Sequence, residues 1–315
     1  MIYTITLNPA IDRLIKVRGS LTKKKTNRVN NTEFDLGGKG LHVSHVLTKF
    51  RIENQALGFI GENNLEQMKK ILEIKEINHQ LFVEKGASTR ECIVIVDDSH
   101  NGSMMVTEDG FHVSDENHQL LIDFIQQQVT SKDMAIIAGS LPPDYTLQKL
   151  KEIMRMLKKK GCFIGCDLSG EALTAAVEME VDFIKPNQFE AEELFANQES
   201  HFVDNIRKLA KKIAYVVVSL GKDGSYVVHG EEMYRVLPPQ IKERNDTGAG
   251  DVFVGAFLAQ LAKGADLQTV IRYATGCSAS KVTKSDCTSF DIHEAEGFFN
   301  EITIFQMGEN QHVIS

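Results

Sequence analysis

A run of small and acidic residues close to position 250 has the composition of a site for a negatively charged group. Asn245 to Asp251 read NDTGAGD and lead directly into an apolar helix that we predict from Val252 to Leu261. Small residues at a helix start let free backbone N–H groups point at one spot, where the helix dipole also favours negative charge. Asp251 could then take a proton from a hydroxyl while these N–H groups stabilise a transferred phosphoryl group. A glycine-rich turn in which Asp251 only caps the helix is the alternative.

A second glycine-rich run precedes another predicted helix. Residues 35–40 read DLGGKG, and an apolar helical pattern follows over 41–50. Glycines around a lysine allow a ligand to approach the backbone closely, and Lys39 offers charge to an anionic group. Neither the P-loop pattern GxxxxGK[ST] nor the dinucleotide pattern GxGxxG occurs in the chain, which disfavours a dinucleotide enzyme.

Three further polar turns follow predicted strands. They are Gly139–Pro143 (GSLPP), Lys185–Asn187 with Glu190 nearby, and Ser219–Gly224 (SLGKDG). Ligands of open α/β sheets bind beyond the carboxyl ends of the strands, so all three turns are placed for a ligand. Each alone can equally be a plain connection between elements.

The elements that must position these motifs alternate along the chain. Apolar, β-branched runs predict strands at Ile2–Leu7, Gln55–Ile60, Met134–Ala138, Phe163–Asp167, Phe183–Lys185 and Tyr215–Leu220. Patterns with a period of 3.6 residues predict helices at Glu116–Gln128, Leu147–Leu157, Asp251–Ala262 and Leu267–Lys281. This repetition predicts an α/β fold, with a mostly parallel sheet covered by helices on both faces.

Two segments interrupt the alternation. Residues 11–33 are polar and basic with strand-like pieces, and residues 89–108 read as a hairpin around a turn at Asp98–Gly102. We therefore predict a small β subdomain made of these two insertions. The remaining residues, 1–10, 34–88 and 109–315, then form one large α/β domain.

Composition limits the class of protein. The 315 residues carry a formal net charge of −8, which argues against a nucleic-acid partner. Every charged residue between Arg13 and Arg28 is basic, so this segment is either a solvated loop or a site for a small anion. The five cysteines are scattered, and no apolar run is long enough to cross a bilayer. We expect a cytoplasmic protein with reduced thiols and no membrane partner.

Together the motifs resemble the PfkB carbohydrate kinase family, of ribokinase-like fold. Residues 246–257 (DTGAGDVFVGAF) fit the family's C-terminal signature at every position, residues 37–40 match its GGKG element, and the match covers essentially the whole chain. The resemblance implies a three-layer α/β/α sandwich with a β-sheet lid formed by the two insertions. Residues 8–12 (NPAID) and Thr89-Arg90 look like the branch that acts on phosphorylated sugars, which includes 1-phosphofructokinase and tagatose-6-phosphate kinase.

The resemblance also implies roles for individual residues. The expected reaction is ATP- and Mg²⁺-dependent phosphorylation of a ketohexose monophosphate, of the 1-phosphofructokinase type that gives fructose 1,6-bisphosphate. Asp251 would be the general base, and Gly248, Ala249 and Gly250 the anion hole. Residues expected at the sugar phosphate are Asp12, Arg28, Gly37, Gly38, Lys39, His42, Arg90 and Ser140. Residues expected at ATP are Lys185, Asn187, Ser219, Gly221, Gly224, Thr247 and Ser278, with Asn187 and Glu190 holding Mg²⁺ through water.

Alternatives remain at the level of the substrate and the assembly. The acceptor could be tagatose 6-phosphate, a free sugar or a nucleoside, and a non-catalytic sugar-phosphate-binding protein is a further alternative. His42 and His45 stand where the branch usually has asparagine and arginine, which puts the usual hydroxyl recognition in doubt. As an i, i+3 pair they could also ligate a metal. The exposed strand edges of a lid could pair two copies, so we expect a homodimer through the lid.

Overall fold

The computed structural model describes residues 1–17, 19, 21–29, 31–97, 103–196 and 200–308. The predicted turn at Asp98–Gly102 lies outside these residues.

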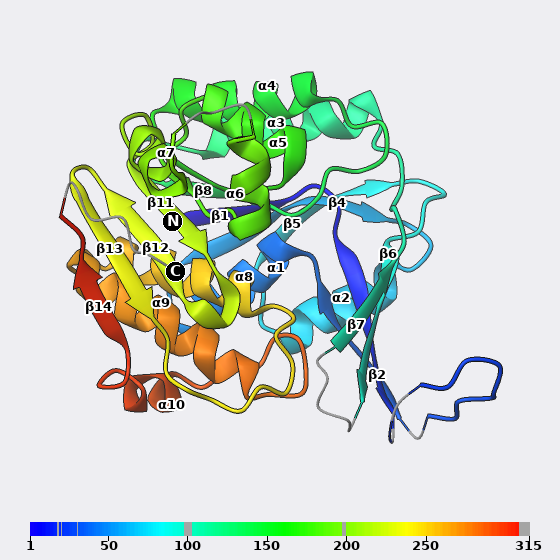
Figure 1. The fold of residues 1–315 in the computed structure, drawn as a ribbon. Coiled ribbons are helices and arrows are strands. Elements are labelled where there is room, and N and C mark those ends of the chain that lie inside the picture. The colour runs from blue at the N-terminus through cyan, green and yellow to red at the C-terminus, as the bar shows by residue number, and fades with distance from the viewer. Residues whose placement is uncertain (18, 20, 30, 98–102, 197–199, 309–315) are drawn as a thin grey trace.

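A ten-stranded sheet runs through the whole molecule (Figure 1). Seven neighbouring strands are parallel: β5 (His79–Glu84), β4 (Asn54–Gly61), β1 (Ile2–Thr6), β8 (Met134–Ala138), β9 (Phe163–Asp167), β10 (Phe183–Ile184) and β11 (Tyr215–Ser219). Three antiparallel strands extend one edge: β12 (Ser225–His229), β13 (Glu232–Leu237) and β14 (Thr303–Gln306). All six predicted strands are confirmed within about a residue at each end, whereas β5 and the three antiparallel strands were not predicted.

Helices cover both faces of this sheet, which confirms the predicted three-layer α/β/α sandwich. One face carries α3 (Asp115–Gln128), α4 (Leu147–Lys160), α5 (Gly170–Glu178), α6 (Gln188–Leu194) and α7 (Phe202–Leu209). The other carries α1 (Lys39–Lys49), α2 (Leu65–Ile74), α8 (Ala249–Ala262), α9 (Leu267–Val282) and α10 (Ile292–Gly297), and a 3₁₀ turn spans Gly221–Asp223. The faces separate because successive strand residues point to opposite sides: Ile137 of β8 lies in one core and Ile136 in the other.

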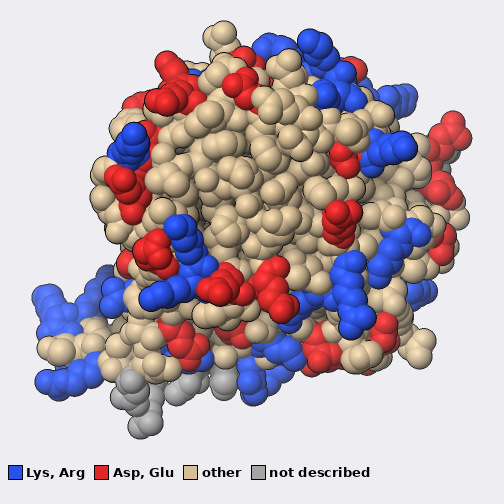
Figure 2. Space-filling view, turned by 180° about the vertical axis from the view of Figure 1, so that it is seen from behind, with Lys and Arg blue, Asp and Glu red and all other residues tan. Residues whose placement is uncertain are grey.

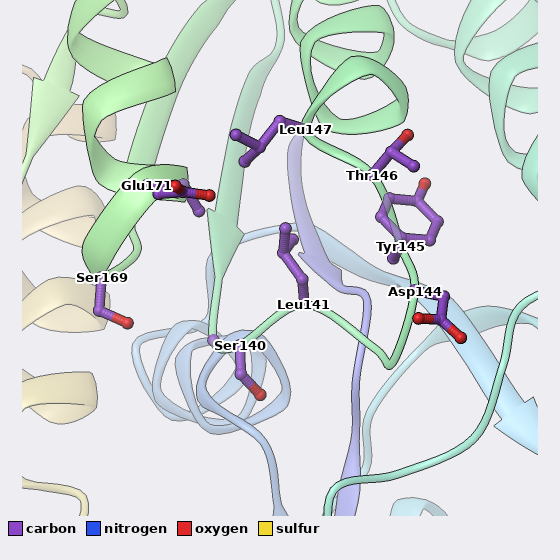
Figure 3. Close-up of a pocket in the computed structure, with 10 residues that line it drawn as sticks. Ser140, Leu141, Asp144, Tyr145, Thr146, Leu147, Ser169 and Glu171 are labelled. Atoms are coloured by element: carbon purple, nitrogen blue, oxygen red, sulfur yellow. The ribbon is translucent and has the colours of Figure 1, made fainter.

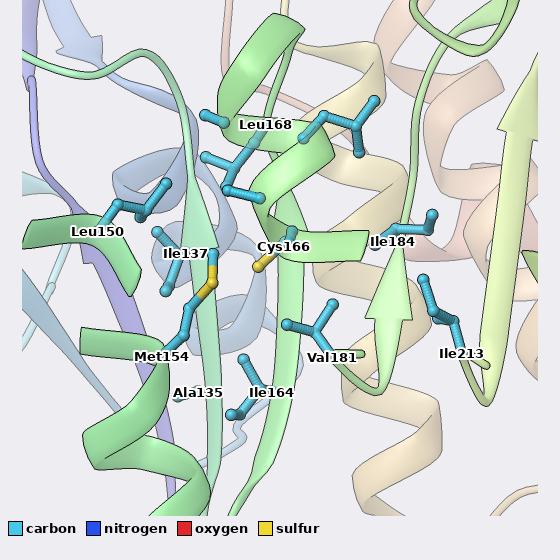
Figure 4. Close-up of a cluster of buried hydrophobic side chains, with 14 of the residues drawn as sticks. Ala135, Ile137, Leu150, Met154, Ile164, Cys166, Leu168, Val181, Ile184 and Ile213 are labelled. Atoms are coloured by element: carbon cyan, nitrogen blue, oxygen red, sulfur yellow. The ribbon is translucent and has the colours of Figure 1, made fainter. Parts of the chain in front are cut away.

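The core between the sheet and α4 holds the central strands in place (Figure 4). Leu150 and Met154, four residues apart on α4, are fully buried with Ile137 and Ile164 of the neighbouring strands. This i, i+4 spacing places both side chains on the face that points at the sheet. The carboxyl ends of β8 and β9 therefore open at the same edge of the molecule.

A separate four-stranded sheet confirms that a small β-sheet accompanies the large one, and we call it the lid. Its strand order is β3 (Thr32–Gly37), β2 (Ala10–Val17), β6 (Arg90–Asp97) and β7 (Ser103–Thr107). The first half extends beyond the predicted segment 11–33, because residues up to Gly37 keep pairing with β2. Its inner face buries Leu14 and Val94 against Cys287 of the large domain.

The basic segment lies mainly on an exposed loop between β2 and β3. Lys23, Lys24, Lys25 and Arg28 are exposed on this loop, and Figure 2 shows Lys and Arg side chains gathered on the projection. None of the helices in the described part of the chain is long and apolar enough to span a membrane. All five cysteines are free and buried.

Candidate active site

The start of α8 carries unpaired backbone N–H groups. Gly248 adopts a left-handed conformation (φ 83°), and a Cβ there would lie 2.2 Å from the carbonyl oxygen of Cys287, so only glycine fits. Within the described residues, the N–H groups of Gly250 and Asp251 have no hydrogen-bond acceptor. The N–H of Ala249, which was predicted to face the anion, is not free, because it donates to the Asp246 carbonyl at 3.0 Å.

A lysine that directly follows β10 adds charge beside this turn. A Cβ added to Gly250 would lie 3.4 Å from Nζ of Lys185, so the absent side chain gives the ammonium access to the turn. Lys185 follows β10 and is buried, with Nζ 3.6 Å from Oδ2 of Asp167. Free N–H groups beside an ammonium favour a bound phosphoryl group.

Close packing of α1 against α8 brings His42 to Asp251. Gly255 lies one turn after Asp251, and a Cβ there would lie 2.5 Å from Cβ of Val46 on α1. The missing side chain therefore lets the two helices approach. As a result, Nδ1 of His42 lies 2.6 Å from Oδ2 of Asp251, although 209 residues separate them in the sequence.

Both ring nitrogens of His42 are used within the protein. Nε2 lies 2.7 Å from the carbonyl oxygen of Leu36, which only accepts, so Nε2 carries a proton. Burial would lower the pKa of His42, but the hydrogen bond to Asp251 and the charges of Asp251 and Asp12 raise the pKa to about 9. The ring is therefore an imidazolium at neutral pH that donates to Asp251 and Leu36, and its nitrogens are not directed at a sugar hydroxyl.

The second histidine does not complete a metal pair with His42. His45 is buried on the same helix, and burial followed by the charges of Lys75 and Lys49 lowers its pKa to about 4. Both nitrogens of His42 already have protein partners, so His42 has no nitrogen free to bind a metal together with His45.

Asp12 of the lid strand β2 faces this pair. It is buried, and Oδ2 lies 3.9 Å from Nε2 of His42. Burial raises the pKa of Asp12 to about 6, although the positive charge of His42 acts to lower it. A Cβ on Gly37 would lie 2.2 Å from Oδ1 of Asp12, and one on Gly40 would lie 2.4 Å from Oγ1 of Thr6. The GGKG glycines therefore allow Asp12 and β1 to lie directly against the start of α1.

Arg90 joins the lid to the large domain. Its guanidinium donates to Oγ1 of Thr107 at 2.9 Å and to the carbonyl of Glu108 at 3.1 Å. On the other side it donates to the carbonyl of Asn8 at 3.1 Å and to Oγ of Ser140 at 3.4 Å. Its Nε–H is buried without a partner. Arg90 makes no described ion pair, so its positive charge remains available to an anion.

Lys39 pairs with a residue that the sequence did not single out. Its Nζ donates to Oδ1 of Asp167 at 3.1 Å, and the charge of Asp167 raises the pKa of Lys39. Burial would raise the pKa of Asp167, but the charges of Lys185 and Lys39 lower it. Asp167 therefore holds two lysines at the carboxyl ends of β9 and β10. Its position as the last residue of a predicted parallel strand was the signal available in the sequence.

The turns expected to bind nucleotide lie along the edge of the large sheet where its parallel strands end. Ser219 at the end of β11 forms a β-bridge with Asn187. Gly224 has φ 94°, and a Cβ there would lie 1.9 Å from the Val236 carbonyl. Ser278 of α9 donates to the Ala249 carbonyl at 3.0 Å, which ties α9 to the start of α8.

The lid also contacts the turn that precedes α8. Oγ of Ser103, at the start of β7, lies 3.0 Å from Oγ1 of Thr247 and 3.4 Å from Oδ1 of Asp246. The expected sugar and nucleotide residues therefore line one continuous region between lid and sheet.

One expected residue and one hollow stand apart from this region. Arg28 is exposed on the β2–β3 loop, and no described contact joins it to the other site residues. A hollow of about 620 Å³ opens between the starts of α4 and α5 and is lined by residues that include Gly139, Ser140 and Glu171 (Figure 3). It adjoins the site at Ser140 and does not include Asp251.

The residues at the start of α6 fit a magnesium ion held through water. Asn187 and Glu190 cap the helix reciprocally: the Glu190 N–H donates to Oδ1 of Asn187, and the Asn187 N–H donates to Oε2 of Glu190. Oε1 of Glu190 has no partner among the described residues and can accept from a bound water. Carboxylate oxygens and water are the ligands that Mg²⁺ prefers.

A buried carboxylate beside free N–H groups and a lysine, at the carboxyl ends of parallel strands, is compatible with phosphoryl transfer. The family model of the pfkB carbohydrate kinases matches residues 5–294. The chain belongs to this family and is a carbohydrate kinase with an alcohol group as acceptor.

Relatives and solved structures agree with this assignment. The chain is 30% identical to 1-phosphofructokinase of Bacillus subtilis, over 92% of this chain and 93% of that protein. It is 26% identical to tagatose-6-phosphate kinase of Staphylococcus epidermidis, over 98% of this chain and all of that protein. The structure of Escherichia coli phosphofructokinase-2 with fructose-6-phosphate superposes with a TM-score of 0.85, at 25% identity and over 95% of this chain and 98% of that one. These comparisons confirm the ribokinase-like α/β fold.

Proposed function

We propose that the protein transfers the γ-phosphoryl group of ATP to a hydroxyl of a ketohexose monophosphate. The 1-phosphofructokinase type, which converts fructose 1-phosphate to fructose 1,6-bisphosphate, is our first choice. The observation that carries the proposal is the position of Asp251, which lies in the first turn of α8 beside its unpaired N–H groups and is linked through His42 to the lid residue Asp12.

Asp251 is the general base in this proposal. Its Oδ2 is held by His42, which leaves Oδ1 to accept the proton of the sugar hydroxyl. The hydroxyl oxygen forms a bond to the γ-phosphorus while the bond from that phosphorus to the bridging oxygen of ADP breaks. The N–H groups of Gly250 and Asp251, with the ammonium of Lys185, stabilise the charge on the transferred group.

The lid side binds the sugar phosphate. Asp12 accepts hydrogen bonds from sugar hydroxyls, and the backbone at Gly37 and Gly38 allows the ring to approach. Arg90 has an unpaired Nε–H and no carboxylate partner, so it can bind the phosphate already on the sugar. Lys39 adds charge there, although it shares that charge with Asp167.

The opposite side binds ATP, with residues from α6, β11 and the start of α8. Magnesium bound with ATP would neutralise phosphate charge, and Asn187 and Glu190 would hold its water shell. The residues proposed around the nucleotide are Lys185, Asn187, Ser219, Gly221, Gly224, Thr247 and Ser278.

We also propose that two copies pair through the lids. Val106, Ile93, Arg13 and Phe34 lie opposite one another across all four lid strands and share the outer face. Val106 is 55% exposed and Phe34 47% exposed, so this face offers apolar surface to a second copy. Escherichia coli phosphofructokinase-2 has been solved as a tetramer in an inhibited form, which shows that a similar protein assembles. Free thiols are typical of the cytoplasm, where we place the protein.

A substrate screen tests the proposed function. ATP consumption is measured with fructose 1-phosphate, fructose 6-phosphate, tagatose 6-phosphate, free ketoses and nucleosides as acceptors. We expect kcat/KM to be highest for a phosphorylated ketohexose. A preference for a free sugar or a nucleoside would contradict the phosphate-binding role of the lid, and absence of turnover with every acceptor would favour a non-catalytic binding protein.

Arg90 gives a sharper test of the phosphate clamp. Arg90→Ala removes the unpaired guanidinium N–H and its charge, so KM for the sugar phosphate should rise by about 10- to 100-fold with a smaller change in kcat. Arg51→Ala, a change at an exposed arginine beyond α1, is the matched control and should leave both constants unchanged. An unchanged KM in Arg90→Ala would remove Arg90 from the phosphate site.

A further inference from the structure

A completely buried lysine lies behind the anion-binding turn. Lys281, in the last turn of α9, has 0% of its surface exposed. Its Nζ donates to the carbonyl oxygen of Asn245 at 2.9 Å, and it forms no ion pair within the described part of the chain. The proposed mechanism does not use this group, although it lies where the NDTGAGD run begins.

The residue that Lys281 holds connects two loops beneath the turn. Asn245 is itself fully buried, and its Nδ2 donates to the carbonyls of Ser285 and Asp286 at 3.3 and 3.2 Å. Its Oδ1 accepts from the N–H of Thr247 at 2.9 Å. Three residues further on, Gly248 rests on the carbonyl of Cys287. A shift of the Asn245 carbonyl would therefore be transmitted to the N–H groups that face the phosphoryl group.

Burying an ammonium without a carboxylate partner is costly, so its retention requires a physical reason. Burial lowers the pKa of Lys281, while the nearby negative groups, including Asp286, Asp246 and Asp251, oppose that change. A fixed positive charge behind the turn favours the negative charge that the turn must bind, and in a buried site this effect is weakly screened.

We propose that Lys281 is a positioning residue that supplies a permanent positive charge next to the Gly248–Gly250 turn. Its ammonium holds the Asn245 carbonyl in place and favours binding of a phosphoryl group at the turn. The proposal rests on the proposed function only in that the turn binds a phosphoryl group. The proposal implies that the protein needs no monovalent cation from solution at the Asn245 carbonyl. It also implies that removing the ammonium leaves the Asn245 carbonyl open to a potassium or ammonium ion, near the two carbonyls that the Asn245 side chain binds, since carbonyl oxygens coordinate such ions.

The test compares Lys281→Met with Lys284→Met. Lys284 is three residues away and partly exposed, and it pairs with Glu294 at 2.7 Å, so its change removes the same charge outside the turn. Turnover is measured in tetramethylammonium chloride and in potassium or ammonium chloride of equal ionic strength. We expect kcat of Lys281→Met to fall by about 10- to 100-fold in tetramethylammonium, with KM for the acceptor little changed, and to recover in potassium or ammonium. The unsubstituted protein and Lys284→Met should respond to neither ion.

A second variant and a second readout keep the test decisive. Lys281→Gln retains a donor for the Asn245 carbonyl but lacks the charge, and it should show the same loss and recovery. Thermal unfolding needs no turnover: Tm of both Lys281 variants should rise when potassium replaces tetramethylammonium, whereas Tm of the unsubstituted protein should not. Potassium activation of the unsubstituted protein, full activity of Lys281→Met in tetramethylammonium, or a loss that no ion restores would each overturn the proposal. Failure of the proposed function would instead appear as no turnover in the unsubstituted protein, and the Tm comparison would still decide the role of Lys281.

Discussion

The imidazolium of His42 determines how the Asp251 carboxylate is presented. It donates to one carboxylate oxygen from Nδ1 and is itself fixed by the Leu36 carbonyl at Nε2. It also lies between two buried acids, Asp251 and Asp12, whose charges it compensates. From sequence alone His42 was expected at the sugar, because the resemblance places it where the sugar-phosphate branch usually has a sugar-contacting asparagine. The geometry supports a positioning role instead, which depends on a contact between residues 209 positions apart.

The variant His42→Asn tests this role. Asparagine can donate to Asp251 but carries no charge, so we expect kcat to fall by about 10- to 100-fold with a smaller effect on KM. A sugar-binding role would give the opposite pattern, with KM raised and kcat retained.

Stability against pH gives an independent measurement on the same variant. The folded-state pKa of His42 is raised from 6.5 to about 9. A raised pKa stabilises the folded state below the unfolded value, and this stabilisation is lost as pH rises through the folded value. Tm of the unsubstituted protein should therefore exceed that of His42→Asn at neutral pH, and the gap should narrow as pH rises through about 9. A gap that is constant with pH would contradict the imidazolium assignment.

At the scale of elements, the site depends on where strands and helices end. The predicted strands end close to where the structure ends them, so Ser140, Lys185 and Ser219 could be placed at one edge in advance. The pairing of Asp167 with two lysines could not be predicted. Nothing in the local sequence distinguishes an aspartate at a strand end that binds lysines from one that is solvated. The antiparallel strands β12 to β14 were likewise missed. For β14 the reason is long range, since its partner β13 lies far back in the sequence, whereas β12 and β13 pair locally and were simply not recognised.

The left-handed turn before α8 provides a direct test at this scale. Gly248→Ala would place a methyl group 2.2 Å from the Cys287 carbonyl at a φ of 83°, so the turn must shift. We expect kcat to fall by about 100-fold or more, the loss typical of a disturbed anion hole, together with a lower Tm. Gly297→Ala is the matched control, because its Cβ would meet no atom within 4 Å. Normal turnover in Gly248→Ala would show that the N–H groups of this turn do not bind the phosphoryl group.

At the scale of the whole molecule, the lid is built from two insertions that are far apart in the sequence, and its strands project from one side of the large domain (Figure 1). Both insertions could be found from the sequence because they interrupt the strand–helix alternation. The packing of the insertions could not be predicted. Cys287 contacts the inner face of the lid and Ser103 contacts Thr247, and these contacts join segments that share no sequence pattern. The outer face has exposed apolar side chains, and the basic loop that carries Arg28 connects two of its strands.

The assembly proposal is tested by charging the outer face. Met104 and Val106 are each about half exposed on β7, and the double change Met104→Glu, Val106→Glu should convert a dimer to a monomer in sedimentation or light-scattering measurements. Ile74→Glu, at a highly exposed apolar residue on α2, should leave the mass unchanged. A monomeric unsubstituted protein, or a dimer that survives the double change, would contradict pairing through the lid.

The central claim is that Asp251 deprotonates a hydroxyl of a ketohexose phosphate for attack on ATP. The most direct measurement is ³¹P NMR of fructose 1-phosphate with ATP and magnesium, recorded with the unsubstituted protein and with Asp251→Asn at equal concentration. We predict stoichiometric fructose 1,6-bisphosphate and ADP with the unsubstituted protein, and a rate about 10²- to 10⁴-fold lower with Asp251→Asn while ATP and sugar affinities are kept. Equal rates with both proteins would contradict Asp251 as the base, and ADP formed without a new sugar phosphate ester would contradict the transfer itself.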